Sequence, residues 1–218
     1  MSTLTTGQAK AYYDRYGARQ ESQAYYEDAA FDALIAHGQF ENADQVFEFG
    51  CGTGRLASRL LAHQLPDTAR YTAVDISDTM VDLTTDRLRP WKDRTVISVS
   101  DGSADLPAAD ASMDRVVSTF VLDLLSARDT HILLEEAHRI LKPGGRLCLA
   151  SLDGGTSPVS RAIGQIWQMV YRLNPLRVGG CRPVDLPSYL ASNSWEIDHH
   201  ASQTRRGISF STLVAHPK

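Results

Sequence analysis

Short apolar runs alternate with amphipathic stretches through the middle of the chain. Arg55–His63, for example, carries leucines at the spacing of one helical face. Strands are predicted at Gln45–Phe49, Tyr71–Ile76, Thr95–Val99, Asp114–Phe120 and Arg146–Leu152. Further helices are predicted from Ser77 or Asp78 to Leu88 and from about Arg128 to Leu141, with a turn at Leu141–Gly145 (LKPGG). This alternation is typical of an α/β fold with a parallel sheet and helices on both faces.

The two ends of the chain do not follow this alternation of strands and helices. The segment from about Gln8 to Gly38 is helical in character and rich in tyrosine. Later segments are predicted as a helix at Val159–Leu173, a turn-rich stretch at Pro175–Leu186 and a short helix at Pro187–Ser192. Two closely connected strands follow at Trp195–Ala201 and Gly207–Ala215, and their short connection favours an antiparallel pair.

Composition and charge narrow the class of protein. Hydrophobic residues make up 43% and charged residues 22% of the chain, as in an ordinary globular domain. The net charge of -4 argues against a protein that grips a nucleic-acid backbone. Cys51, Cys148 and Cys181 lie far apart and without metal-ligand spacing, so neither a metal site nor a disulfide framework is predicted. Without a signal-type or membrane-spanning apolar run, we expect a cytoplasmic protein, and a homodimer is left open.

The residues best suited to binding a ligand lie where the first predicted strand ends, at Val46–Gly54 (VFEFGCGTG). Its three alternating glycines allow positive φ and a close approach of the backbone to a ligand. Glu48 stands before them, where a carboxylate suits an ammonium group better than a pyrophosphate. Asp75 ends the second predicted strand and can accept hydrogen bonds from both ribose hydroxyls. S-adenosylmethionine (SAM) carries both an ammonium group and a ribose.

Two alternatives to a SAM-dependent enzyme stay open. An NAD(P)-dependent oxidoreductase also has an acid about 20 residues beyond its glycines, but its loop has the spacing G-x-G-x-x-G. The spacing in this chain is G-x-G-x-G, which counts against a dinucleotide. A SAM-binding partner subunit without catalytic activity would keep the same loop.

These residues resemble motifs of the class I SAM-dependent methyltransferases, particularly the group that includes ubiquinone/menaquinone-biosynthesis enzymes. EFGCGTG is similar to the family's first motif and Ala73–Ser77 (AVDIS) to its ribose-binding strand end, and the resemblance covers Val46 to about Leu152. It implies a Rossmann-like, seven-stranded, mostly parallel sheet with an antiparallel last strand. It also implies a helical lid formed by residues 1–40 over a SAM-binding domain of residues 41–218. The implied reaction is methyl transfer to a small molecule, with S-adenosylhomocysteine as product.

The resemblance also implies positions for the cofactor. SVSDGSADLP (98–107) is similar to the family segment that places an acid at the adenine amino group, here Asp101, with the Gly102 amide near the ring. Cofactor contacts are therefore predicted at Tyr16, Glu48, Gly50, Cys51, Gly52, Gly54, Asp75, Ile76, Asp101, Gly102 and Thr119. No catalytic residue is predicted, because in-line displacement from a sulfonium depends mainly on positioning.

A few polar side chains have more than one interpretation. Asp123 either faces the cofactor or substrate or caps the next helix, and the second interpretation is favoured. Arg177 and Arg182 suit an anionic acceptor, but also a solvated loop or ion pairs. His199 and His200 are neighbours on a predicted strand, so at most one of them faces a site.

Overall fold

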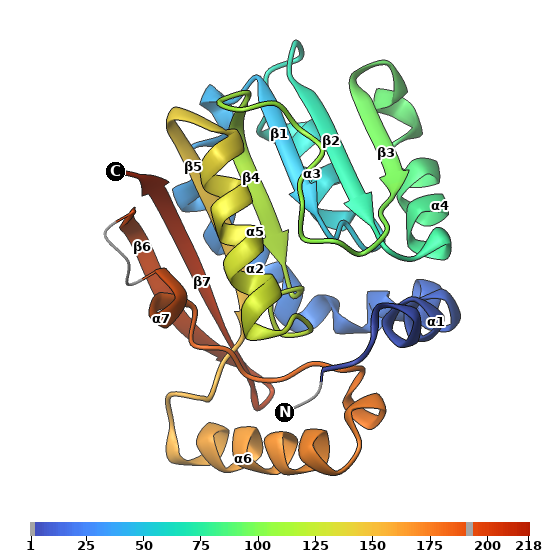
Figure 1. The fold of residues 1–218 in the computed structure, drawn as a ribbon, viewed down its shortest axis with the longest axis vertical. Coiled ribbons are helices and arrows are strands. Elements are labelled where there is room, and N and C mark those ends of the chain that lie inside the picture. The colour runs from blue at the N-terminus through green and yellow to red at the C-terminus, as the bar shows by residue number, and fades with distance from the viewer. Residues whose placement is uncertain (1–2, 191–193) are drawn as a thin grey trace.

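The computed structural model describes residues 3–190 and 194–218, which form a seven-stranded sheet with the order β3-β2-β1-β4-β5-β7-β6 (Figure 1). The strands are β1 (Gln45–Phe49), β2 (Arg70–Asp75), β3 (Thr95–Val99), β4 (Met113–Thr119), β5 (Leu141–Leu152), β6 (Trp195–Arg205) and β7 (Ile208–Pro217). The pairs from β3 to β5 are parallel, whereas β7 runs antiparallel to both of its neighbours. The predicted sheet with an antiparallel last strand is confirmed.

Helices cover both faces of this sheet, as predicted. On one face, α2 (Ala24–Gly38) and α3 (Arg55–His63) share a buried cluster with Val46 of β1. On the other, α5 (Ala127–Ile140) and α7 (Leu186–Leu190) share a second cluster with Phe47 and Phe49 of the same strand. Side chains that follow one another in a strand point to opposite faces, so one short strand supplies both layers.

The remaining helices lie near the edge and the carboxyl ends of the parallel strands. α4 (Asp78–Arg87) packs beside β2 and β3, and the Ser77 side chain caps it by accepting from the Met80 amide, as predicted. α1 (Thr6–Tyr16) and α6 (Pro158–Leu173) lie beyond the carboxyl ends (Figure 1). Four short 3-10 helices complete the fold: η1 (Gly17–Gln23), η2 (Phe40–Asn42), η3 (Arg89–Arg94) and η4 (Pro175–Val178). No described helix is long and apolar enough to cross a bilayer.

Two local predictions need correction, and a third lies partly outside the described residues. The N-terminal helical segment is interrupted at Gly17, whose φ of 48° ends α1 and starts η1. LKPGG lies inside β5 instead of forming a turn before it, because its extra residues bulge between the β4 pairings of Met113 and Arg115. The predicted helix at 187–192 corresponds to α7, and its last two residues lie outside the described residues.

A buried arginine joins α2 to the sheet. The Arg115 guanidinium on β4 donates to the Gly38 carbonyl at 2.6 Å and to the Gln39 carbonyl, at the end of α2. Gln39 itself takes a left-handed φ of 51°. These carbonyls have no further intrahelical partner, so the arginine satisfies groups that would otherwise be buried unpaired.

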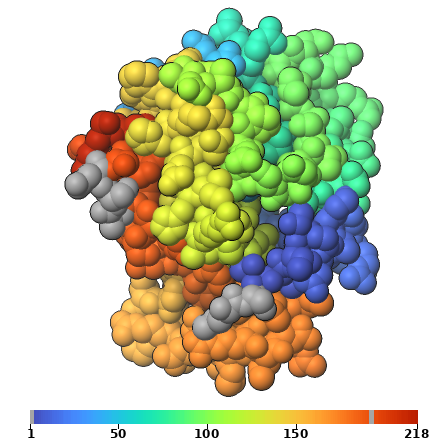
Figure 2. Space-filling model, viewed as in Figure 1, coloured from blue at the N-terminus to red at the C-terminus, as the bar shows by residue number. Residues whose placement is uncertain are grey.

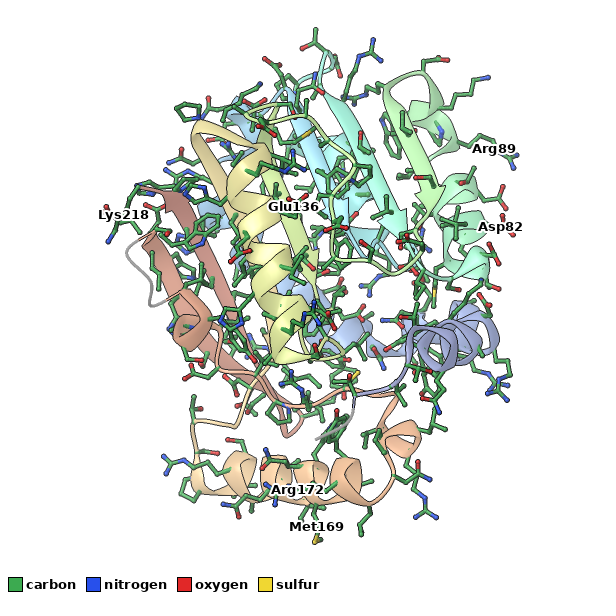
Figure 3. The ribbon with its side chains drawn as sticks, viewed as in Figure 1. Asp82, Arg89, Glu136, Met169, Arg172 and Lys218 are labelled. Atoms are coloured by element: carbon green, nitrogen blue, oxygen red, sulfur yellow. The ribbon has the colours of Figure 1, made fainter. Side chains whose placement is uncertain are left out.

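Replacing this arginine should weaken the fold. Arg115→Met leaves the buried Gly38 carbonyl and the partly buried Gln39 carbonyl without their charged donor, and we expect the free energy of unfolding to fall by about 3 kcal/mol. Urea denaturation measures this. Arg89→Met is the control, because Arg89 is exposed (Figure 3) and, among the described residues, its one ion pair is with exposed Asp86. Its change should stay below about 0.5 kcal/mol, and equal losses in the two variants would contradict the role given to Arg115.

Candidate functional site

Hydrogen bonds hold the glycine turn after β1 against the end of β2. The amides of Gly50 and Cys51 both donate to the Val74 carbonyl, at 2.8 and 3.1 Å. The Gly52 amide donates to Oδ2 of Asp75 at 2.9 Å. The turn needs positive φ at Gly50 (80°) and Gly52 (53°), which glycine adopts without a Cβ clash. Two strand ends and one acid are thereby held as a unit.

Gly54 has a different place from the other two glycines. It is the N-cap residue of α3 with a φ of 73°, and a Cβ on it would come within 3.0 Å of the Thr84 side chain on α4. The Thr84 hydroxyl in turn donates to the Gly52 carbonyl at 2.7 Å. Gly54 therefore permits close packing of α3, α4 and the turn.

A cavity opens at the carboxyl ends of β1, β2 and β4, with about 1190 Å³ of empty space including its mouth. Of the predicted cofactor contacts, those that line it are Glu48, Gly50, Cys51, Gly52, Asp75, Ile76, Gly102 and Thr119. The structure thus brings together residues from three strand ends and the loop after β3. Their contact with a cofactor stays a prediction.

Three predicted contacts are not among the residues that line the cavity. Asp101 is exposed, and its carboxylate accepts from the Ser103 amide at 2.8 Å. The Tyr16 hydroxyl accepts from the Gln23 side chain at 3.2 Å, and its ring stacks on Tyr12. Gly54 lies behind the turn. For these three residues a direct cofactor contact stays a prediction that the empty cavity does not favour.

The N-terminal helices supply part of the cavity lining. Of the α1 tyrosines that the resemblance makes candidates for contact, Tyr12, Tyr13 and Tyr16, only Tyr13 is among the lining residues, and Glu27 and Phe31 of α2, which the sequence did not predict, line the cavity as well. Oε2 of Glu27 pairs with Arg55 Nη1 at 2.7 Å, at the first residue of α3. A signal was present: Glu27 falls among the apolar positions that bury α2, and an acid there needs a buried partner.

Glu48 is the acid closest in sequence to the glycines, and its environment is apolar. It is almost fully buried at 1% exposure, lines the cavity and accepts a hydrogen bond from the Tyr71 hydroxyl at 2.9 Å. Burial raises the pKa of Glu48 to about 8, against the opposing effect of the tyrosine hydrogen bond. A cation bound beside this carboxyl would favour its ionised form.

Asp123 does not cap the next helix, so the favoured interpretation of this residue is wrong. Ser126 caps α5, its hydroxyl accepting from the Asp129 amide at 3.1 Å, because the chain turns once more before the helix begins. Asp123 is fully buried, and neither carboxylate oxygen has a hydrogen-bond partner among the described residues. Burial raises its pKa to about 7, and the charge of Arg182 only partly offsets this.

The other polar candidates lie outside the cavity. The Arg182 guanidinium donates to the Leu125 carbonyl at 2.6 Å, so it holds the chain in place, and Arg177 is exposed on η4. The His199 ring stacks on His37 with centroids 3.6 Å apart, on the side of α2 and β6. Neither His199 nor His200 is among the lining residues. Within the described residues, no cluster of three or more side chains could hold a metal ion.

The unpaired acid predicts a pH-dependent stability. The pKa of Asp123 is about 7 in the folded chain against an ordinary 3.8, so the folded chain binds this proton more tightly than the unfolded chain does. The resulting contribution to the free energy of unfolding is full below about pH 4 and is lost as the pH rises to about 7. In the wild type the free energy of unfolding should fall by up to about 1.4 kcal/mol per pH unit for this reason, and Asp123→Asn should remove that fall. Denaturation between these pH values measures it. The control is Asp82→Asn at an exposed acid (Figure 3), which should keep the wild-type profile; an unchanged profile in Asp123→Asn would contradict the prediction.

A matched pair of glycines separates backbone strain from lack of space. Gly50 and Gly144 have φ of 80° and 79°, but a Cβ at Gly50 would lie 2.2 Å from the Val121 side chain, and one at Gly144 would meet nothing within 4 Å. Both alanine variants should lose about 1–2 kcal/mol through the left-handed conformation. Only Gly50→Ala should displace Val121 and abolish SAM binding in a calorimetric titration. Equal SAM binding by the two variants would exclude Gly50 from the cavity wall.

Comparison with known proteins agrees with this geometry. Residues 46–145 match the family model of a methyltransferase domain. Over 135 residues the chain is 34% identical to the demethylmenaquinone methyltransferase of Symbiobacterium thermophilum, covering 60% of this chain and 50% of that protein. The chain spans about half the length of the curated relatives it matches.

Solved structures share the architecture at low sequence identity. The [4+2]-cyclase SpnF superposes with a TM-score of 0.73 and 15% identity, over 99% of this chain and 98% of that one. Geranyl diphosphate C-methyltransferase from Streptomyces coelicolor, in complex with S-adenosyl-L-homocysteine, has a TM-score of 0.64 and 18% identity, over 88% and 79% of the two chains. These likenesses show the fold alone. Residues 46–145 are thus similar to a methyltransferase domain, and nearly the whole chain shares its fold with these structures.

Proposed function

We propose that this protein binds SAM in the cavity at the strand ends and transfers its methyl group to a small-molecule acceptor, releasing S-adenosylhomocysteine. The observation that supports this most is the joined unit of Glu48, the glycine turn and Asp75 along one wall. Its carboxyl groups and open backbone suit a ligand with an ammonium group and a ribose. A pyrophosphate would meet the Glu48 carboxyl there.

In this proposal Asp75 holds the ribose. Oδ1 accepts from the Ser77 amide and Oδ2 from the Gly52 amide, both at 2.9 Å, so the carboxylate cannot rotate freely. Each oxygen has a second lone pair, which leaves two acceptor positions for two hydroxyls. Burial raises the pKa of Asp75, and these backbone donors offset that effect only in part.

The two ends of the cofactor meet different surfaces in this proposal. Glu48, oriented by Tyr71, faces the ammonium group, and Gly50 and Gly52 let the methionine portion approach the backbone. The adenine lies against the surface that Ile76 and Gly102 form together, since the two residues are in close contact and a Cβ on Gly102 would come within 2.8 Å of Ile76 Cδ1. Asp101 and Tyr16 lie outside the cavity lining and would contact the cofactor through side chains that turn inward on binding, whereas Gly54 acts by its close packing against Thr84 behind the turn.

The remaining wall is where the acceptor would bind. It includes the apolar side chains of Phe31, Phe120 and Leu125, with the Tyr13 ring beside them. SAM supplies an electrophilic methyl group on a sulfonium, and the protein has to exclude water and align the nucleophile with it. Glu27 lies on the same wall, and its ion pair with Arg55 also joins α2 to the start of α3.

A different chemistry in the same fold remains the competing hypothesis. A structure described as a cyclase matches nearly the whole chain, so the architecture by itself does not specify methyl transfer. A SAM-binding subunit without catalysis would also keep this cavity. Turnover must therefore be measured separately from binding. We further propose a cytoplasmic location, where the three unpaired cysteines stay reduced, and leave a homodimer open.

Calorimetric titration with SAM, S-adenosylhomocysteine and NAD tests the cofactor. We expect binding of the first two only, because the wall carries acids and no pyrophosphate site. A screen of methyl release across phenols, amines, carboxylates and quinone precursors then tests catalysis. Binding of NAD alone would refute the proposal, and SAM binding without any methyl release would favour the non-catalytic subunit.

Glu48 predicts a proton that leaves when SAM binds. Because its pKa is about 8 in the empty cavity, the carboxyl is largely protonated at pH 7 and must ionise to pair with an ammonium group. Titration in buffers of different ionisation enthalpy should show release of close to one proton, on the order of the fraction protonated one pH unit below the pKa. Glu48→Gln should bind at least about tenfold more weakly and release none. The same proton release in both proteins would remove Glu48 from the ammonium site.

A further inference from the structure

The outward face of α6 carries an apolar stripe that nothing in the described chain covers. Val159, Ile166, Met169 and Leu173 are 70%, 57%, 56% and 82% exposed, and Leu176 of η4 continues the line at 41%. The spacing of the four α6 residues, by seven, three and four positions, places them on one side of the helix. Figure 3 shows Met169 pointing away from the body of the protein.

The opposite face of α6 is already occupied by the protein. Ser160 and Tyr171 are buried, and the Trp167 indole donates to the Cys181 carbonyl at 2.9 Å. Ile163 lies against Gly207, in the turn between β6 and β7. α6 is therefore anchored by one face, and the exposed stripe is a surface that the fold presents to its surroundings. In the space-filling view the helix forms the lower border of the molecule (Figure 2).

The charge around this stripe differs from that of the rest of the chain. From Gly154 to Val184 there is no aspartate or glutamate, although the whole chain has a net charge of -4. Arg161, Arg172 and Arg177 are exposed in the same stretch, and Arg172 is labelled on α6 in Figure 3. Two copies packed through this face would bring arginines together without acids of the same stretch to pair with them. An apolar stripe with a basic border is complementary to an anionic lipid surface.

We propose that α6 is an interfacial helix that docks the protein on an anionic lipid bilayer, with the apolar stripe inserted among the acyl chains and the arginines at the headgroups. The segment that follows α6 and η4 reaches a cavity residue, because the hydroxyl of cavity-lining Tyr13 donates to the Gly179 carbonyl at 3.4 Å. Docking would therefore hold one wall of the cavity close to the lipid surface. This inference concerns the outer surface, and it stands independently of the reaction proposed above.

Cosedimentation of the full chain with vesicles tests this surface. We expect binding to equimolar phosphatidylglycerol and phosphatidylcholine, little binding to phosphatidylcholine alone, and weakening between about 0.1 and about 0.5 M salt. Ile166→Gln with Met169→Gln should lower the partition coefficient at least about tenfold, because both apolar side chains leave the lipid. Val96→Gln is the matched control, since Val96 on β3 is 62% exposed but far from α6 in the fold, and its binding should equal wild type.

A second double variant tests how much the arginines contribute to binding of the anionic vesicles. Arg172→Gln with Arg177→Gln should weaken binding to the anionic vesicles about 25-fold at low salt, about fivefold for each arginine. Thermal melting and SAM titration of every variant should match wild type, so a failure here is distinct from a failure of the proposed function. Absence of vesicle binding, equal binding to neutral vesicles, or binding unaffected by the Ile166 and Met169 changes would overturn the proposal. A dimer in light scattering that these two changes dissociate would assign the stripe to a second copy instead, and would equally overturn it.

Discussion

The hydrogen bonds between the glycine turn and the end of β2 are the constraint on which the site depends. One carbonyl, that of Val74, accepts from two consecutive amides, and the Asp75 carboxylate accepts from the turn and from the start of α4. These bonds require positive φ at Gly50 and Gly52, and so they require residues without a Cβ. They hold two strand ends, two helix starts and an acid in one arrangement before any ligand is present, which is the preorganisation that tight binding needs.

The N-terminal helices are joined to that arrangement by charged contacts. Asp14 of α1 accepts from the Ser77 hydroxyl at 2.6 Å, at the cap of α4. Arg55, the first residue of α3, pairs with Glu27 of α2, and the arginine side chain is only 13% exposed. Such shielded pairs are costly to break from one side, since the remaining charge would be left without a partner. The wall proposed for the acceptor is thus joined to the wall proposed for the cofactor. The division into a lid of residues 1–40 and a domain of residues 41–218 stays a prediction, and α2 packs directly on β5 and β7.

Much of this could be read from local signals in the sequence. The period of the apolar positions indicated the strands and helices, and Ser77 before an acidic first helical residue indicated a cap. What the sequence could not show depends on contacts between distant segments. Ser126 displaced Asp123 as the cap of α5 because the chain turns once more there, and Tyr13 displaced Tyr16 at the cavity because α1 presents that side to the loop after η4. The bulge within β5 likewise arises from its pairing with β4. Glycine spacing is a property of the chain, whereas the face that a tyrosine presents is a property of the packed helix.

A crystal structure with bound S-adenosylhomocysteine tests the central claim most directly. The account predicts both ribose hydroxyls within hydrogen-bond distance of the Asp75 carboxylate, and the amino-acid portion along Gly50–Gly52 with its ammonium group near Glu48. It also predicts that the glycine turn keeps its bonds to Val74, because the turn is already formed in the empty cavity. A ligand bound elsewhere in the chain, or one whose ribose lies away from Asp75, would contradict the account.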